Sequence, residues 1–133
     1  ALLANSLLIN TNLKKVVGKH ANLQDADIAH ADLQNSNFFG ADLRGANLSN
    51  ANLKNSIFSN SRMQNTIFVK TDMSNANFTG AILSGAVIDS VSMNGAIFKN
   101  VKLKGTYLKN VSFVNALVDG TSFENAILEN VRF

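Results

Sequence analysis

The sequence predicts an all-β fold in which the backbone turns once every five residues and stacks these turns into a solenoid. Three observations lead to this fold. From residue 21 onward the 133-residue chain repeats every five positions without an insertion, the third position of each repeat is always apolar, and the fifth is dominated by Asn and Gly. A fixed short period is typical of repeat proteins, which bury their apolar side chains between stacked copies.

A period of five fits neither a regular helix nor a straight strand. Five residues advance an α-helix by about 500°, which spreads the apolar set around its whole circumference. In a straight strand an odd period sends successive apolar residues to opposite faces of the sheet. The apolar residues can therefore share one interior only if the chain bends in every repeat.

The other repeat positions support this bend. The fifth position carries residues that tolerate positive φ, such as Asn35 and Gly40, so we expect a corner there. The first position is always small and lies on the same face as the third, where it leaves room for the larger side chain. The predicted core ladder includes Leu23, Leu43, Leu53, Phe58, Phe78, Phe98, Phe113 and Phe123.

The units ADLQN (31–35), ADLRG (41–45) and ANLKN (51–55) resemble those of the pentapeptide-repeat family, and the resemblance covers residues 21–133. It implies a right-handed quadrilateral β-helix with four repeats in each coil, about six coils, and a filled interior.

Residues 1–20 leave two interpretations open. Leu3, Leu8 and Leu13 keep the register of the repeats, which predicts a degenerate first coil, but Gly18 stands where a core residue belongs. The alternative is an N-terminal capping helix, because repeat rods usually need a cap. The chain has no initiating Met and stops within a repeat at Phe133, so we expect a segment of a larger protein.

Composition excludes several classes of protein. The chain has no Cys, so it has no disulfide framework, no thiol nucleophile and no cysteine-bound zinc. No apolar run is long enough to cross a bilayer, and residues 1–10 lack the basic start of a signal peptide. We expect a soluble protein, in the cytoplasm rather than in a lumen or secreted, without direct membrane contact.

No constellation of residues points to catalysis. His20 and His30 are predicted at opposite corners, too far apart to share a metal ion. Asp25, Asp27, Asp32 and Asp42 could suggest paired carboxylates, but Asn and Asp at such positions are expected to be solvated. We therefore expect no enzyme activity, cofactor, metal or small-molecule substrate, also because a filled interior has no cleft.

Charge is ordered along the predicted axis. Residues 21–43 contain four Asp and no Lys or Arg, whereas residues 91–115 contain Lys99, Lys102, Lys104 and Lys109 and no acidic residue. This order is compatible with partner docking steered by a field, or with chance scatter on a solvated surface. The lysines are spread over different sides, which makes nucleic acid an unlikely partner despite a net charge of +3.

An apolar column is predicted on the outside of the second half. Second positions there often become apolar, and those spaced by twenty should stack on one side. This candidate interaction flank comprises Ile67, Val69, Val87, Tyr107 and Ile127. The column either stabilises stacked strands through cross-strand pairs or binds a partner protein. Ile57, Ile97 and Leu117 form a broken column on the opposite side.

The sequence therefore favours a non-catalytic scaffold or protein-interaction module, such as a repeat domain of a regulator, adaptor or secreted effector. The family resemblance implies an alternative, since some members imitate DNA and bind type II topoisomerases such as gyrase. That role requires a strongly acidic surface and typically a C-terminal helical dimer module, and the net charge of +3 departs from the first requirement.

Overall fold

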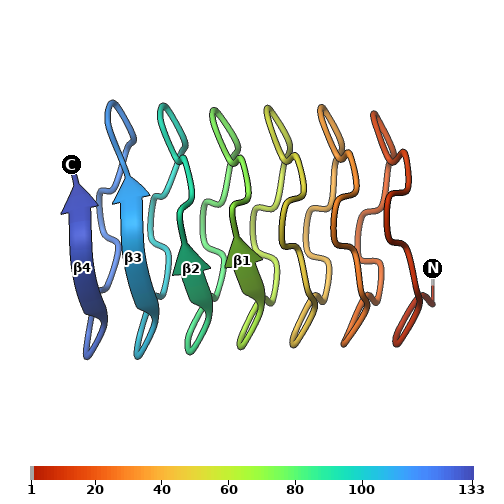
Figure 1. Cartoon of the computed structure of the whole chain (residues 1–133), viewed down its shortest axis with the longest axis horizontal. Coiled ribbons are helices and arrows are strands. Elements are labelled where there is room, and N and C mark those ends of the chain that lie inside the picture. Colours follow the sequence, from red (N-terminus) through yellow and green to blue (C-terminus); the bar gives the residue numbers. More distant parts are fainter. Residues whose placement is uncertain (1) are drawn as a thin grey trace.

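The computed structural model describes residues 2–133, which form a right-handed, four-sided β-helix. Residues twenty apart lie directly over one another, as in the parallel bridges from Asn22 to Asp42 and from Asp42 to Arg62. The coils follow one another in sequence order along a straight rod, with the N-terminus at one end and the C-terminus at the other (Figure 1). The fold class predicted from the five-residue period is confirmed.

Regular strands begin on one side of the rod, in its second half, and the two longer ones continue past a corner onto the next side. They are β1 (Ile67–Val69), β2 (Val87–Asp89), β3 (Tyr107–Ser112) and β4 (Ile127–Arg132), and they form a parallel sheet in the order β1-β2-β3-β4. In most other repeats the coils are joined by isolated parallel bridges at the second position. The front of Figure 1 shows the four strands side by side.

Each repeat bends at its fifth residue, which has positive φ, for example 58° at Asn35 and 66° at Gly40. The following N–H closes the turn by donating back across it, as from Ser36 N to Leu33 O at 3.2 Å. Asn and Gly tolerate this left-handed conformation best, which explains why they dominate the position.

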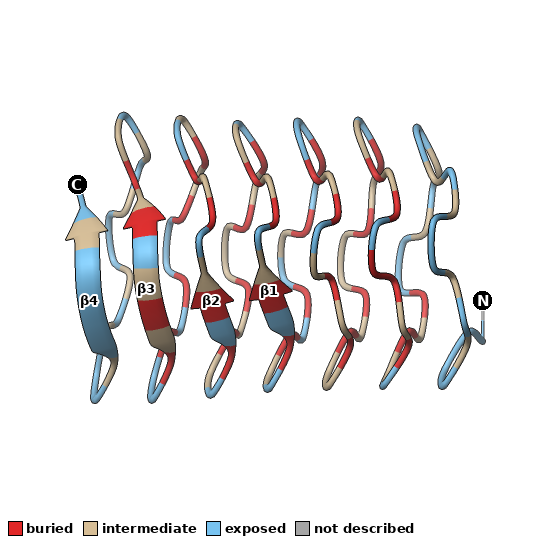
Figure 2. Cartoon of the chain, viewed as in Figure 1, coloured by how far each residue is buried: buried red, intermediate tan, exposed pale blue. Residues whose placement is uncertain are grey.

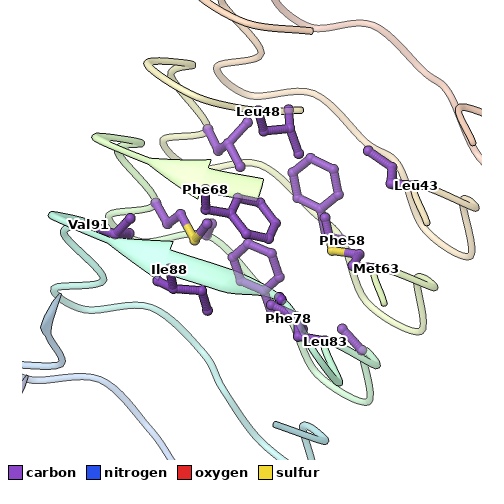
Figure 3. Packing of buried hydrophobic residues seen from close by; sticks show 14 of the residues in the cluster. Leu43, Leu48, Phe58, Met63, Phe68, Phe78, Leu83, Ile88 and Val91 are labelled. Atoms are coloured by element: carbon purple, nitrogen blue, oxygen red, sulfur yellow. The ribbon is translucent and has the colours of Figure 1, made fainter. Parts of the chain in front are cut away.

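The interior is a solid stack of third-position side chains, and Figure 3 shows part of it in close-up. The rings of Phe38, Phe58 and Phe78 are nearly parallel, with centroids 5.5 Å apart at each step. Of the predicted core ladder, Phe123 is only half-buried, because no further coil among residues 2–133 covers it. The fully buried members of the ladder are Leu23, Leu43, Leu53, Phe58, Phe78, Phe98 and Phe113.

Small polar residues enter the core only where their hydroxyl groups find acceptors. The Thr66 Oγ1 donates to Leu43 O at 2.9 Å, and the Ser36 Oγ donates to Leu33 O at 2.6 Å. Both residues occupy the first position of a repeat and are buried. Hydrogen bonding removes most of the cost of burying such groups.

Residues 2–20 pair with the next coil. Leu2, Leu7, Asn12 and Val17 form parallel bridges to the residues twenty positions later, and no helix occurs in the described part of the chain. The structure thus places a coil where the sequence left a capping helix open. The space at Gly18 is taken by the ring of Phe38, since a Cβ at Gly18 would lie 2.4 Å from that ring. Figure 2 shows that this first coil is mostly exposed or half-buried.

Candidate interaction surface

Four of the five residues of the candidate interaction flank stack on one another, one on each of the strands β1 to β4. Ile67 pairs with Val87, Val87 with Tyr107, and Tyr107 with Ile127. Ile67 and Val87 are 39% and 38% exposed, and Ile127 is 61% exposed. Cross-strand stacking therefore leaves a substantial part of each of these three side chains in contact with solvent. The flank is a continuous apolar column on a regular sheet.

Charged side chains line the same sheet beside this column. In the next three coils the position of Val69 is occupied by Asp89, Lys109 and Glu129, each stacked on the one before. Lys109 Nζ lies 3.5 Å from Glu129 Oε1, and the Tyr107 hydroxyl donates to Glu129 Oε2 at 3.1 Å. Desolvation, the hydrogen bond to Glu129 and its negative charge raise the pKa of Tyr107 above 10.0. The flank thus combines an apolar centre with a polar edge, as protein interfaces commonly do.

The column on the opposite side is interrupted, as the sequence predicted. Ile57 and Ile97 are separated by Asn77, which forms bridges to both. Asn77 Oδ1 accepts hydrogen bonds from the N–H and the hydroxyl of Thr79, at 3.0 and 2.7 Å. A polar residue therefore divides this column, whereas the flank on β1 to β4 is continuous.

Asn and Asp at the second position serve the backbone locally. Asn47 Oδ1 accepts from Ser49 N at 3.1 Å, and Asp27 Oδ1 accepts from Ala29 N at 3.2 Å. These two residues precede Ile67 in the same column, and an Ile side chain has no acceptor for such a bond. The apolar residues of the flank cannot accept this local hydrogen bond. A gain in stability alone therefore explains their presence at the second position less well.

The candidate catalytic residues do not converge. Asp32 pairs with Lys14 at 3.1 Å, and Asp42 pairs with Arg44 at 2.7 Å, so both carboxylates belong to surface ion pairs. His20 packs edge-on against Phe39. Within residues 2–133 no group of three potential ligands could hold a metal ion. The same residues contain no helix that is long and apolar enough to cross a membrane.

Ion pairs within and between coils reduce the axial charge order that the sequence suggested. Lys104 pairs with Glu124 at 3.2 Å and Lys109 with Glu129, while Lys14 and Arg44 neutralise part of the acidic segment. This pairing is not evident from the sequence, because the partners are mostly about twenty residues apart. A long-range field along the rod is therefore weaker than the segment charges imply.

The ion pair at Asp42 makes stability depend on pH. The Arg44 side chain donates to both oxygens of Asp42, at 2.8 and 2.7 Å, and this lowers the pKa of Asp42 below 3.8, against the opposing effect of burial. A carboxyl group with a lower pKa in the folded chain binds fewer protons than in the unfolded chain. Its contribution is therefore complete above about pH 4 and is lost as the pH falls through the folded-state pKa.

We expect chemical denaturation to give a lower free energy of unfolding at pH 3 than at pH 6. Asp42→Asn should make this difference smaller, because it keeps an acceptor for the Arg44 N–H but removes the titrating charge. Asp27→Asn is the matched control at the same repeat position, where no salt bridge is found within residues 2–133. An unchanged difference in Asp42→Asn would contradict the assignment.

Comparison with known proteins agrees with this geometry. The family model of pentapeptide repeats matches in eight copies, over residues 1–35, 36–75, 56–95 and 96–133. The chain belongs to the pentapeptide repeat family. No protein of curated function matches the sequence.

Solved pentapeptide repeat structures resemble the rod. Two trypsin-treated variants of QnrB1, a plasmid-mediated fluoroquinolone resistance protein, superpose with TM-scores of 0.59 and 0.55 at 19% and 21% identity. The matches cover 94% and 96% of this chain and 71% and 72% of those chains. HetL, involved in heterocyst differentiation regulation in the cyanobacterium Nostoc sp. strain PCC 7120, matches at 22% identity and a TM-score of 0.45. That match covers 96% of this chain, which spans 64% of HetL. At 19% and 21% identity, the likeness to the two QnrB1 variants shows the fold alone.

Proposed function

We propose that this protein is a non-catalytic scaffold that binds another protein through the flank formed by Ile67, Val69, Val87, Tyr107 and Ile127. The observation that carries the proposal is the continuous column of partly exposed apolar side chains on β1 to β4. Contiguous exposed apolar surface with a polar edge usually marks a contact site in soluble proteins.

The solid interior supports the same proposal. Side chains fill the rod in its middle coils, where Phe58, Phe68 and Phe78 are fully buried. In these described middle coils the interior has no room for a substrate, which favours recognition by outward residues. Outward Tyr and branched aliphatic side chains on a rigid sheet bind with little loss of conformational entropy.

The DNA-mimic alternative has less support. Imitation of DNA requires a continuous stripe of negative charge, but Asp32, Asp42 and Asp72 each pair with a Lys or Arg side chain. The net charge of the chain is +3. A gyrase supercoiling assay at low salt separates the two proposals, since the scaffold proposal expects no inhibition by the isolated chain.

The flank is tested by the double variant Val87→Ser/Tyr107→Ser. Both side chains point outward on the sheet, so we expect the far-UV circular dichroism spectrum to be unchanged. The control Ile57→Ser/Ile97→Ser removes similar side chains from the interrupted column on the opposite side. Photo-crosslinkers placed at residues 69 and 99 in each protein, followed by mass spectrometry, identify what contacts either side in extracts of the source cells.

We expect at least one protein to crosslink at residue 69 in the wild type and in the control. Its affinity, measured afterwards with the purified partner, should fall about tenfold or more in the flank variant, as for an interface centre. Equal affinity of both double variants for that partner would overturn the proposal, as would crosslinking only at residue 99.

A further inference from the structure

Two opposite charges lie at the centre of the flank on β1 to β4. Asp89 of β2 stacks on Lys109 of β3, and both lie beside the apolar column at Val87 and Tyr107. Lys109 pairs with Glu129 in the next coil. The Asp89 carboxylate forms no salt bridge within residues 2–133. It is therefore an acidic group of the flank that a cation on a partner can still pair with.

Glycine corners border the same two coils on the other edge of the flank. Gly85 and Gly105 form the corners before β2 and β3, with φ of 71° and 65°, and both are exposed. In the coils on either side, the same corner position is occupied by Asn65 and Asn125. A Cβ at Gly105 would meet no atom within 4 Å, so the space outside this corner is open. The backbone of a partner can therefore approach the flank most closely at its two central coils.

The arrangement of these residues is self-complementary under one rotation. A two-fold axis that runs along the strand direction, midway between Val87 and Tyr107, places a second copy face to face with the first and antiparallel to it. Each coil of β1 to β4 then lies opposite a coil of the second copy, in reverse order. The rotation pairs apolar with apolar, corner with corner and negative with positive: Ile67 with Ile127, Val87 with Tyr107, Asn65 with Asn125, Gly85 with Gly105, and Asp89 with Lys109. Two-fold dimers require a surface with this property.

The charges select this register among the antiparallel arrangements. Sliding the second copy by one coil moves the axis to the level of Val87 or of Tyr107. Asp89 then faces Asp89 of the second copy in the first case, and Lys109 faces Lys109 in the second. Like charges that face each other across an interface oppose binding. Sliding by two coils leaves only two of the four stacked apolar side chains opposite one another.

A parallel arrangement is disfavoured for the same reason. A two-fold axis along the rod would turn the edge that carries Lys109 and Glu129 toward the opposite edge of the flank on the second copy. At the same height, just across the corner from that edge, lie Lys104 and Glu124. Lys would then approach Lys, and Glu would approach Glu. The antiparallel register is the one in which the apolar column, the corners and the charges are all compatible.

We propose that the partner bound by the flank is a second copy of this chain, packed antiparallel on β1 to β4 with Asp89 of each copy opposite Lys109 of the other. The inference rests on the proposed function, because it names the partner of the same surface. The contact is isologous, so it gives a closed dimer. Its central coils, those of β2 and β3, are covered by other coils on both sides (Figure 1). Four coils form a small interface, so we expect a reversible dimer with a Kd on the order of 10 μM.

Sedimentation velocity, from well below to well above that concentration, tests the dimer. The wild type should pass from monomer to dimer and no further. Asp89→Lys places Lys opposite Lys at both symmetric contacts, and Lys109→Asp places Asp opposite Asp, so each variant alone should show at least a tenfold higher Kd. Asp119→Lys makes the same charge change on the opposite side of the rod and should dimerise like the wild type. Circular dichroism and thermal melting establish that each variant is folded.

Mixing the two charge variants gives the decisive result. At the two exchanged positions Asp89→Lys offers only positive charges and Lys109→Asp only negative charges, so an equimolar mixture should form a heterodimer more tightly than either variant forms a homodimer. The double variant Asp89→Lys/Lys109→Asp restores both contacts within one chain and should dimerise on its own. An unchanged Kd in either single variant would overturn the proposal. A mixture that binds no more tightly than the single variants would do so too, as would a weaker dimer in Asp119→Lys.

The flank variant separates this inference from the proposed function. Val87→Ser/Tyr107→Ser should remain monomeric, whereas Ile57→Ser/Ile97→Ser should dimerise, and a flank variant that dimerises like the wild type would overturn the inference. If the wild type is monomeric at every concentration and a different protein crosslinks at residue 69, the second copy is excluded as the partner and the proposed function stands. If the wild type is monomeric and nothing crosslinks at residue 69, both fail.

Discussion

Replacing Phe58 with Ala is expected to lower the free energy of unfolding by about 3–5 kcal/mol, the usual cost of removing a buried Phe ring. Phe58 lies between the rings of Phe38 and Phe78, at 5.5 Å from each, and is fully buried. The filled coils above and below cannot collapse into the space, because their spacing is fixed by backbone hydrogen bonds. Urea denaturation followed by circular dichroism measures the loss.

Phe133→Ala is the matched control for this prediction. Phe133 occupies the same repeat position and also stacks on another Phe, but it is 65% exposed. In a repeat protein, stability is approximately a sum over neighbouring coils, so a change at the end should cost much less than one in the middle. Equal losses in the two variants would mean that burial within the aromatic stack is not the main source of stability.

The second large effect is expected at the corners, for Gly80→Val. Gly80 has a φ of 70°, and an added Cβ would lie 2.3 Å from Oδ1 of Asn60, directly below it. The substitution therefore adds a steric contact to the backbone strain of a branched residue at positive φ. Gly105 has a φ of 65° with nothing within 4 Å of an added Cβ, so Gly105→Val reports the strain alone.

We expect Gly105→Val to cost about 2 kcal/mol and Gly80→Val to cost more. Adding Asn60→Gly to Gly80→Val should bring the loss back to that of Gly105→Val, because the contact is removed and the strain remains. Denaturation of the two single variants, Asn60→Gly and the double variant completes the thermodynamic cycle. A cycle with no coupling between the two positions would show that Asn60 moves aside without cost.

The sequence was sufficient to predict the coil and most of its interior. The third residue of every five-residue repeat from residue 23 onward is apolar, and only a chain that bends in each repeat can enclose all of these residues. The predicted column of Ile67, Val87, Tyr107 and Ile127 follows from the twenty-residue coil that the family resemblance implies, and β1 to β4 have that register. Whether this flank binds a partner stays a prediction.

Other features could not be predicted from the sequence. Phe123 follows the core pattern but is only half-buried, because burial depends on the coil above as well as on the residue itself. Gly18 breaks the pattern, and only the position of the Phe38 ring explains how the first coil tolerates it. Opposite charges far apart in the sequence pair across coils, as Lys54 does with Asp72.

The sequence by itself determined the repeat, its corners and its inward residues, because these depend on residue size and backbone preference within five positions. The tertiary structure decided which outward residues touch, which ions pair and what each end of the rod exposes. These features depend on contacts between residues twenty positions apart, and on whether a further coil is present, which no local pattern encodes.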